Sequence, residues 1–432
     1  MDCKRLDDLK IPNTLIWDMI RRPKNDADRI HRAFAIFFWR TNRGFLVRLR
    51  CLVRLVLSPF SIAGLIRKRL GRLGKAARDI SGKSILKQCL EQFYLAYFFS
   101  VTPKTYYLQE FYRQDGVKRA RNHVRREALK DGVYILVKKH LQSTVACDPL
   151  PPALSDKLKV ASFLSQHDIP TIPVIMEFRQ GGQLVSHVAP SETDSLPKQD
   201  IFGKPRHSKG GRFTELWYWI GNGKYRNPRD VILTSAELYR RFSDIAEQQK
   251  SYLIQPLVMP HPDLEDFRIN ATPSLRAISY CYDKEIKVES VRLKFTLQEH
   301  AIVDNTHTGA VSVPVDLATG KMTMAVESKT KKLGHRWDEH ELLNGPIRDR
   351  RVPYLTETVS IVKAAHALFP HDLVVGWDVL ISEKGPVIIE GNDQPDTTFP
   401  QKAFLSSYGG KEVGKVLADN AEMAISNLFT RR

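Results

Sequence analysis

Several features that mark other classes of protein are missing from this 432-residue chain. Its five cysteines are widely spaced, form no CxxC or zinc-like pattern, and their odd number argues against a closed disulfide framework. The opening segment, MDCKRLDDLK, lacks the apolar core of a signal peptide, and no uninterrupted apolar run approaches membrane-spanning length. We therefore expect a cytoplasmic protein that is neither secreted nor membrane-spanning.

Acidic residues are also scarce. The 48 Asp and Glu residues are outnumbered by 66 Lys and Arg, which gives a net charge of +18. Such an excess favours anionic partners: nucleotide phosphates, acidic glycans, lipid head groups or nucleic acid. We expect no nucleic acid, because the positive charge is not interleaved in a recognised binding module. The chain has no internal repeat, and its length allows a sizeable core and two or three domains.

Residues 1–148 form a basic region that we expect to be mainly helical. Arg29–Lys75 mixes apolar clusters with regularly spaced arginines, as basic amphipathic helices do. Such helices either make peripheral contact with an anionic membrane, here at its inner face, or pack their apolar face on the protein and leave the arginines in water, which is the commoner outcome. We expect the aromatic cluster Phe93–Phe99 to be buried core. The prolines of Asp148–Pro152 mark the end of this region.

Beyond this boundary, helical and strand patterns alternate with hairpins, which indicates an α/β or α+β fold and not a uniformly parallel sheet. Ser155 is a plausible N-cap for a helix at residues 156–167, and Thr234-Ser235 for a helix at residues 236–249. A third helix is predicted at residues 353–368. Strands are predicted at residues 171–178, 252–258, 275–282, 287–295, 311–315 and 321–326.

The most informative stretch is VVGWDVLISEKGPVIIEGNDQPDTTFPQ, residues 374–401. Two apolar segments flank the polar turn Ser382–Gly385, which predicts a β-hairpin. A hairpin centred near Lys384 sets Asp378 opposite Glu390, give or take one position, and Asn392 faces the same side if the strand continues. Hard oxygen ligands that converge in this way predict a Mg²⁺ site. The alternative is an ordinary hairpin whose acidic residues face solvent.

Two further segments carry basic residues in patterns suited to phosphate. Asp200–Arg212 predicts a short strand that ends at Lys204, followed by a basic loop closed by Gly210 and Gly211, whose backbone N–H groups can approach phosphate oxygens. The Walker pattern GxxxxGK[ST] is absent, so this loop is not a P-loop. Arg276 and Arg292 lie on the predicted hairpin, symmetrically about Asp283-Lys284, so that one site could use both.

The order of these pieces resembles the ATP-grasp enzymes. The segments GWDVLISEKGPVIIEGNDQPD, LIQPLVMPHPDLEDF, SLRAIS and VDNTHTGAVSVPVDLATGK resemble more narrowly the sugar-transfer-associated ATP-grasp branch, which is related to alpha-L-glutamate ligases. The resemblance covers residues 150–430 and implies an α+β fold of two lobes, at residues 149–257 and 258–432, with the nucleotide between them. The chain departs from the family at Pro256, where relatives often carry Glu, and at His307, Gly309 and Ala310, where a paired glycine is more usual.

The resemblance also implies a set of site residues. The nucleotide, ATP, would meet Lys157 and Lys204 at its phosphates and the backbone of the hinge strand at its adenine, with His261 or Asp263 near the ribose. Arg276 and Arg292 match arginines that meet the γ-phosphate and the acyl phosphate, and Asp304, Asn305 and His307 match a loop near the reacting phosphoryl group. The implied nucleotide contacts are Lys157, Lys204, Gly210, Gly211, Gln255, Pro256, Leu257, Val258, His261 and Asn305. The implied Mg²⁺ ligands are Asp378, Glu390 and Asn392.

These residues lead to the hypothesis of an ATP-dependent ligase that activates a carboxylate as an acyl phosphate and joins it to an amine. Lys204, Arg276 and Arg292 would offset the charge of the transferring phosphoryl group, and His307 is a candidate base for the amine. The resemblance suggests cell-envelope or polysaccharide chemistry. Two alternatives stay open: a phosphotransferase acting on a hydroxyl group, and a membrane- or glycan-associated binding protein with a degenerate ATP site.

Overall fold

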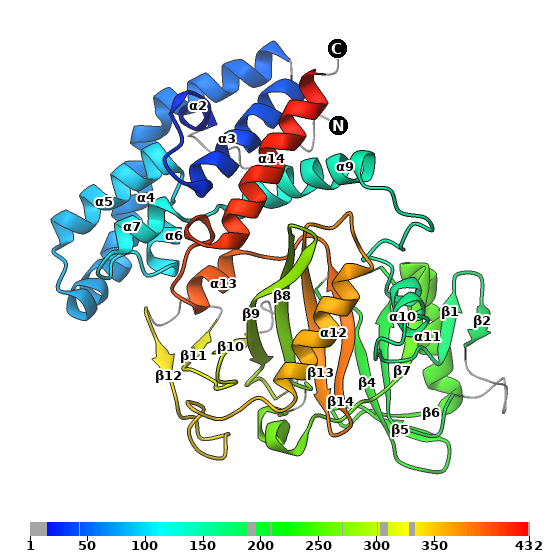
Figure 1. Ribbon diagram of the computed structural model, residues 1–432. Coiled ribbons are helices and arrows are strands. Elements are labelled where there is room, and N and C mark those ends of the chain that lie inside the picture. Colours follow the sequence, from blue (N-terminus) through cyan, green and yellow to red (C-terminus); the bar gives the residue numbers. More distant parts are fainter. Residues whose placement is uncertain are drawn as a thin grey trace.

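The computed structural model describes residues 15–42, 44–187, 196–207, 210–269, 271–299, 301–302, 310–327 and 333–430. A group of helices lies at one end of the molecule, and two antiparallel sheets with their covering helices form the rest (Figure 1). The helical end is built from α2 (Leu15–Ile20), α3 (Asp26–Thr41), α4 (Phe45–Ser81), α5 (Ile85–Phe99), α6 (Pro103–Leu108), α7 (Gly116–Arg121), α8 (Arg126–Ala128), a π-helical turn at Leu129–Val133, and α9 (Tyr134–Thr144).

The first sheet has seven strands in the order β2-β1-β7-β3-β4-β5-β6. The helix α11 (Ser235–Gln249) packs on β1, β6 and β7. It begins at a capping box, in which the Thr234 hydroxyl accepts from the Glu237 N–H and the Glu237 carboxylate accepts from the Thr234 N–H. The strands are β1 (Met176–Arg179), β2 (Gln183–Ser186), β3 (Ile201–Pro205), β4 (Glu215–Trp219), β5 (Lys224–Arg226), β6 (Ile232–Thr234) and β7 (Ser251–Pro256).

The second sheet also has seven strands, in the order β12-β11-β10-β9-β8-β13-β14. Its strands are β8 (Ser274–Tyr282), β9 (Glu285–Phe295), β10 (Val311–Val315), β11 (Ala325–Glu327), β12 (Arg336–Trp337), β13 (Val374–Ser382) and β14 (Gly385–Asn392). The remaining helices are α10 (Lys157–Ser165), the 3-10 helix η2 (Pro262–Phe267), α12 (Leu355–Ala367), α13 (Thr398–Ala403), the 3-10 helix η4 (Tyr408–Gly410) and α14 (Glu412–Thr430).

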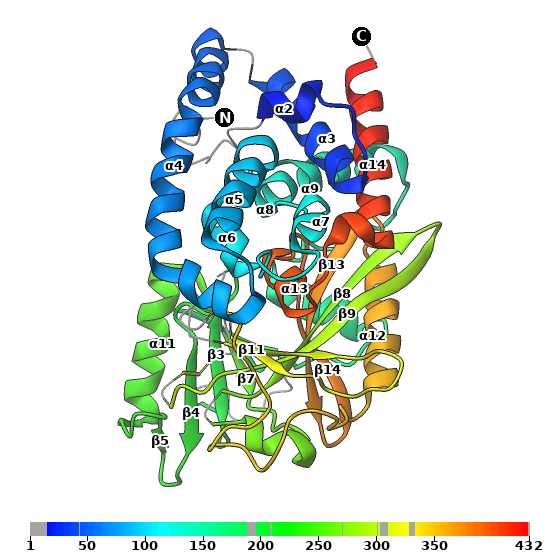
Figure 2. The ribbon, with the colours of Figure 1, turned by 90° about the vertical axis from the view of Figure 1, so that its left-hand side faces the viewer.

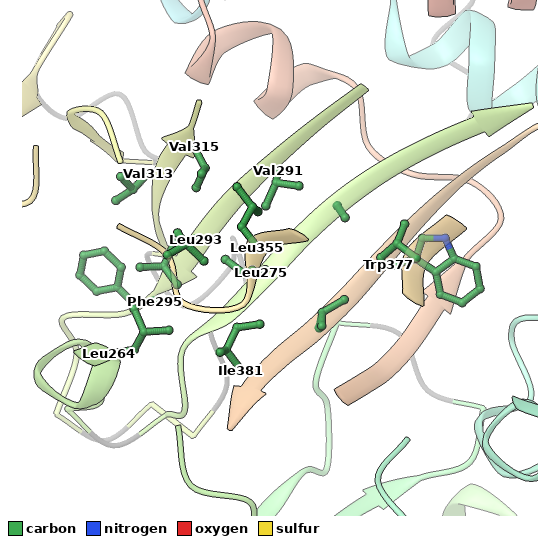
Figure 3. Close-up of a cluster of buried hydrophobic side chains, with 14 of the residues drawn as sticks. Leu264, Leu275, Val291, Leu293, Phe295, Val313, Val315, Leu355, Trp377 and Ile381 are labelled. Carbon is green, nitrogen blue, oxygen red and sulfur yellow. The ribbon is translucent and has the colours of Figure 1, made fainter. Parts of the chain in front are cut away.

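Alternation along β8, β9 and β13 gives the second sheet two chemically different faces. The odd-numbered residues Leu275, Leu293 and Trp377 are fully buried and contribute to a cluster on the face covered by α12 (Figure 3). The even-numbered residues on the same strands include Arg276 and Asp378, which therefore emerge on the opposite face. The core and the charged face are thus two sides of the same strands.

The C-terminal helix belongs spatially with the N-terminal helices. Figures 1 and 2 both show α14 beside α3 at the helical end of the molecule. A shared apolar cluster joins Phe34 of α3, Leu417 of α14 and the sheet residue Tyr280. Arg29 also donates hydrogen bonds to Asp419 and Glu422. The two ends of the described chain therefore pack together, and the helical end is anchored on the second sheet.

Most of the predicted elements are confirmed, including the two hairpins β8–β9 and β13–β14. The predicted N-cap Ser155 is wrong: Asp156 caps α10 by accepting from the Lys159 N–H at 3.2 Å, and its carboxylate is also bound by Arg206. The strand predicted at residues 171–178 begins only at Met176. Pro173 has no N–H to donate to a ladder, which accounts for the late start.

The aromatic cluster of α5 is buried on one face only. Leu95 and Phe99 are buried, whereas Phe93 and Tyr94 are partly exposed, because a helix that packs on one side leaves its other side in solvent. The prediction that the whole cluster is core is therefore only half right. The described cysteines, Cys51, Cys89, Cys147 and Cys281, are all free thiols.

Replacing Phe295 with alanine tests the importance of the core of the second sheet. Phe295 is fully buried, and its ring lies 5.0 Å from that of Phe267 and 6.3 Å from that of Trp337. We expect Phe295→Ala to lower the free energy of unfolding, measured with urea, by about 3–5 kcal/mol. The exposed Phe213→Ala is the control and should change it by less than about 0.5 kcal/mol. Equal effects of the two variants would contradict this packing.

Candidate active site

A cleft with about 1010 Å³ of empty space, open solvent included, lies between the two sheets. One wall comes from β3, β4 and the end of β7, and the other from β8, β13 and β14. Eight predicted nucleotide-contact residues line it, together with the predicted metal ligands Asp378 and Glu390. Those eight are Lys157, Lys204, Gly210, Gly211, Gln255, Pro256, Leu257 and Val258.

A row of charged residues crosses four neighbouring strands of the second sheet. Arg292 on β9 pairs with Arg276 on β8, Arg276 pairs with Asp378 on β13, and Asp378 pairs with Glu390 on β14. The pairing of Asp378 with Glu390 confirms the register predicted from the hairpin. A β-bulge between Asp378 and Val379 lies beside this pair. The row runs from two cations to two anions, and its acidic end, Asp378 and Glu390, lines the cleft.

Asp378 is bound by two cations. Its carboxylate accepts hydrogen bonds from Arg276 at 2.8 and 2.7 Å, and Lys294 lies 2.9 Å from one of the same oxygens. Burial alone would raise the pKa of this carboxyl group, but the charges of Arg276 and Lys294 outweigh burial and hold the pKa below its ordinary value. Asp378 is therefore an anion at neutral pH. The sequence did not point to Lys294, although it lies two residues after Arg292 and hence on the same face of β9.

Lys204 is a buried cation at the end of β3. Only 6% of the residue is exposed, and burial lowers the pKa of its ammonium group to about 8, with the charge of Lys157 acting in the same direction. The negative charges of Glu390 and Asp378 act in the opposite direction. Lys204 thus faces the acidic pair from the other side of the cleft.

Arg206 joins the two segments that carry Lys157 and Lys204, the two lysines of the cleft. Its guanidinium donates two hydrogen bonds of 2.7 Å to Asp156, the residue that caps α10, and one of 3.0 Å to the fully buried Glu177. Lys157 is the first residue of α10, and Lys204 precedes Arg206 by two residues. This bidentate pair therefore fixes the start of α10 against the end of β3, which places both lysines at the same cleft.

Arg292 is buried without a carboxylate partner among the described ion pairs. Its Nε atom has no hydrogen-bond partner in the part of the chain that is described, and its guanidinium carbon lies 5.3 Å from the centre of the Phe399 ring. Burial, together with the neighbouring charge of Arg276, lowers the pKa of Arg292 to about 10. A buried cation whose Nε donor has no partner among the described residues suits an incoming anion.

The oxygen donors around Glu390 fit a Mg²⁺ ion. Asp378 has one of its four lone-pair positions unused once Arg276 and Lys294 are bound, and Glu390 is absent from the described ion pairs. Asn392 pairs with Gly376, and its Oδ1 atom accepts from the Gln394 N–H at 3.0 Å, so it has one position left. Among the described residues no group of three or more His, Cys, Asp or Glu converges, so any ion here would need water or phosphate oxygens as further ligands.

The hinge strand and the glycine loop supply backbone groups to the cleft. Gly210 and Gly211 both have positive φ angles, 74° and 69°, a conformation that glycine adopts without strain. Pro256 has no N–H, and the Leu257 N–H donates to the Asp200 carbonyl at 3.0 Å, so neither offers a donor to a ligand.

Of the predicted site residues that the structure describes, Arg276, Arg292, Asn392 and His261 do not line the cleft itself, although Arg276 and Asn392 lie on strands that border it. The His261 N–H donates to the Ile381 carbonyl at 2.7 Å, and its ring accepts from the Asp263 N–H and lies against Tyr354. His261 therefore caps the helix η2, and its contact with a ribose stays a prediction. Asn305 and His307 lie outside the described residues, as does Asp304.

The fold and this cleft define an ATP-grasp protein. Residues 138–411, well over half of the chain, match the family of sugar-transfer associated ATP-grasp proteins. The chain belongs to this family, as its C-terminal motifs predicted. The match begins within α9, so most of the N-terminal helices lie outside it.

No curated protein matches the chain. Solved structures that resemble it include D-alanine–D-alanine ligase from Bacillus anthracis in complex with ATP, with 11% identity over 65% of this chain and 67% of that one and a TM-score of 0.34. An L-amino acid ligase from Bacillus licheniformis is 10% identical over 62% of this chain and 48% of that one, with a TM-score of 0.35. The VanG D-Ala:D-Ser ligase from Enterococcus faecalis is 14% identical over 64% of each chain, also with a TM-score of 0.35.

Replacing Asp378 with asparagine tests the charge arrangement of the site. Because the variant removes the anion that the largely buried Arg276 and the buried Lys294 share, we expect the free energy of unfolding at pH 7 to fall by about 3 kcal/mol. The pKa of Asp378 is lower in the folded protein than in the unfolded chain. Asp378 therefore stabilises the fold fully when the pH is above the unfolded-state pKa, and this stabilisation is lost as the pH falls through the folded-state pKa. The difference between wild type and variant should therefore shrink below about pH 4.

Urea titrations at several pH values measure this difference. Glu383→Gln, on the exposed turn of the same hairpin, serves as the matched control and should leave stability unchanged. A variant as stable as wild type at pH 7 would contradict the role of Asp378 as the anion that two cations share.

Proposed function

We propose that the protein is an ATP-dependent carboxylate–amine ligase that forms an amide through an acyl phosphate. The observation that carries this proposal is the charged row Arg292–Arg276–Asp378–Glu390, whose acidic end lines the same cleft as the buried Lys204 in an ATP-grasp fold. With Mg²⁺ bound at its acidic end, the row can receive a triphosphate there. The arginine end can receive a second anion, such as a substrate carboxylate.

In this proposal, ATP occupies the cleft with its phosphates near Lys157, Lys204 and the loop at Gly210 and Gly211. Its adenine lies near the end of β7, where Pro256 and Leu257 have no donor to offer. Carbonyl oxygens and the Val258 backbone would therefore carry the recognition of the base. In this proposal His261 lies near the ribose and Asn305 near the phosphates.

Asp378, Glu390 and Asn392 would hold Mg²⁺, which when bound neutralises phosphate charge and orients the phosphate oxygens. Arg276 and Lys294 keep Asp378 anionic. Lys294 would thus be a positioning residue for the ligand Asp378. Glu390 takes part in none of the described ion pairs, so its carboxylate can serve as a metal ligand.

The proposed reaction has two steps. A carboxylate oxygen of the first substrate attacks the γ-phosphorus of ATP, and the bond to the bridging oxygen breaks to release ADP. The amine nitrogen then attacks the acyl carbon, phosphate leaves with the electron pair of the C–O bond, and the nitrogen loses a proton, for which His307 remains the predicted base. Arg292 and Arg276 would hold the substrate carboxylate and then the acyl phosphate.

The family to which the chain belongs is associated with sugar transfer, which supports a role in cell-envelope or polysaccharide modification. The carboxylate would then be part of a sugar or of a group attached to it. We propose a cytoplasmic location, since ATP is available there. We propose two lobes, at residues 149–257 and 258–432; β3, β4 and β7 belong to the first, and β8, β13 and β14 to the second.

Release of ADP in the presence of paired pools of carboxylates and amines tests the ligase reaction. We expect turnover to require both an acid and an amine, and Glu390→Gln and Lys204→Ala each to lower it by about 100-fold or more, because each removes a charge near the transferring phosphoryl group. Glu383→Gln is the matched control and should retain full turnover. Variants of Glu390 and Lys204 that match wild type would overturn the site assignment.

The same assay separates the two enzyme alternatives. A ligase releases free phosphate and forms an amide, whereas a phosphotransferase leaves the phosphate on a hydroxyl product. Phosphate that stays on the product, without any need for an amine, would therefore replace the ligase proposal by a kinase.

The pKa of Lys204 predicts how nucleotide binding depends on pH. Because the ammonium group loses its proton as the pH rises through about 8, we expect the affinity for ATP with magnesium to weaken above that pH. The bound phosphates favour the charged form, which shifts the midpoint upward. Calorimetric titrations between about pH 7 and pH 9.5 measure the effect, and Lys204→Arg, which keeps its charge throughout, should flatten the profile. An equally steep decline in this variant would contradict the role of Lys204.

A further inference from the structure

The long helix α4 exposes an apolar face that nothing in the described structure covers. Phe45, Val56 and Phe60 are 76, 71 and 79% exposed, and Leu49 and Leu52 lie between them on the same face. Of the described helices, α4 alone has the length and composition to cross a membrane, and only 22% of its most apolar 18-residue window is buried. Exposed apolar side chains in such a contiguous stripe mark an interaction surface.

This exposed stripe is not the face by which α4 packs on the protein. Cys51, Ser58, Ile62 and Ile66 are buried on the other side of the helix, and Ile62 and Ile66 form a cluster with Ala96 of α5. Figure 2 shows α4 along the outer edge of the helical end, with α5 and α6 on its inner side. The helix is therefore held by one apolar face and presents a second one outward.

The second half of α4 carries positive charge. The exposed residues Arg67, Lys68, Arg72, Lys75 and Arg78 follow the apolar stripe along the helix. Over its whole length α4 has nine basic residues and one acidic residue, Asp79, which pairs with Arg78 at 3.5 Å. The first half of α4 thus exposes apolar side chains, and the second half exposes basic side chains that attract anions.

We infer that α4 docks the protein on an anionic lipid bilayer. The apolar side chains from Phe45 to Phe60 enter the boundary between head groups and acyl chains, and the basic half from Arg67 to Arg78 meets anionic head groups. This inference does not depend on the ligase reaction. It goes beyond the expectation from the sequence, which favoured packing of the apolar face on the protein, because α4 has two apolar faces and the protein covers only one.

Charge and packing select the bilayer over two other arrangements. A second copy of the chain would bring two strongly basic helices together, which electrostatic repulsion opposes. A membrane crossing would strip Ile62 and Ile66 from α5 and place Arg50 and Arg54 within the hydrocarbon, which is costly for charged side chains. Docking in the plane of the interface keeps the inner contacts and lets the arginines reach water or head groups.

Co-flotation of the full chain with lipid vesicles tests the inference. We expect binding to vesicles of phosphatidylcholine mixed with phosphatidylserine, and binding at least about tenfold weaker to pure phosphatidylcholine. The triple variant Phe45→Ser, Val56→Ser, Phe60→Ser should weaken binding to the anionic vesicles by about tenfold or more, because binding scales with the apolar area buried. Arg67→Gln, Lys68→Gln, Arg72→Gln should also weaken it and reduce its dependence on salt.

A matched triple variant at exposed apolar positions elsewhere, Val231→Ser, Leu317→Ser, Leu342→Ser, should bind vesicles like wild type. Circular dichroism checks that each variant is folded, and ATP affinity should be the same in all, which separates this test from that of the ligase. Equal vesicle binding by the α4 and control variants would overturn the inference. So would resistance of the bound protein to alkaline extraction, which indicates a crossing, or a concentration-dependent dimer that protects Phe60→Cys from labelling in the absence of lipid.

Discussion

The placement of Asp378 between Arg276 and Lys294 is the interaction on which the rest of the candidate site depends. A carboxylate inside a sheet of apolar strands is costly unless cations satisfy it, and here two of them bind the same group at 2.7 to 2.9 Å. Asp378 remains charged as a result, and Glu390 on the neighbouring strand stands outside the described ion pairs. The same strands bury Leu275, Leu293 and Trp377 on their other face, so core and site constrain one another.

The hydrogen bonds of Arg206 help to fix the two walls of the cleft relative to each other. Arg206 binds Asp156 at the start of α10 and Glu177 on β1, while α10 itself packs on β14 of the other sheet. The strand that carries Lys204 is thus tied, through one helix, to the strand that carries Glu390. Positive and negative groups can face each other across the cleft because a short chain of contacts holds both walls.

The helices at the helical end contact the segment next to the candidate site on one side and expose α4 to solvent on the other. Lys138 of α9 lies 2.7 Å from Asp372 and 3.0 Å from Asp393, and Gln109 donates to the Thr398 carbonyl, so these helices hold the segment that follows β14. On its outer side the same group of helices presents α4. Docking of α4 on a bilayer would leave the cleft unchanged, because no residue of α4 lines the cleft.

The sequence by itself determined the hairpins, the alternation of their faces and the pairing of Asp378 with Glu390, because strand periodicity and turn position act locally along the chain. It also identified the family, since the motifs of residues 374–401 are contiguous. Tertiary structure alone decided that Lys294 shares Asp378, that Arg206 binds Asp156 and that Asp156 displaces Ser155 as the N-cap. It also decided that α4 leaves one apolar face uncovered. These outcomes depend on which side chains from distant segments meet in space, and neither spacing nor composition encodes that.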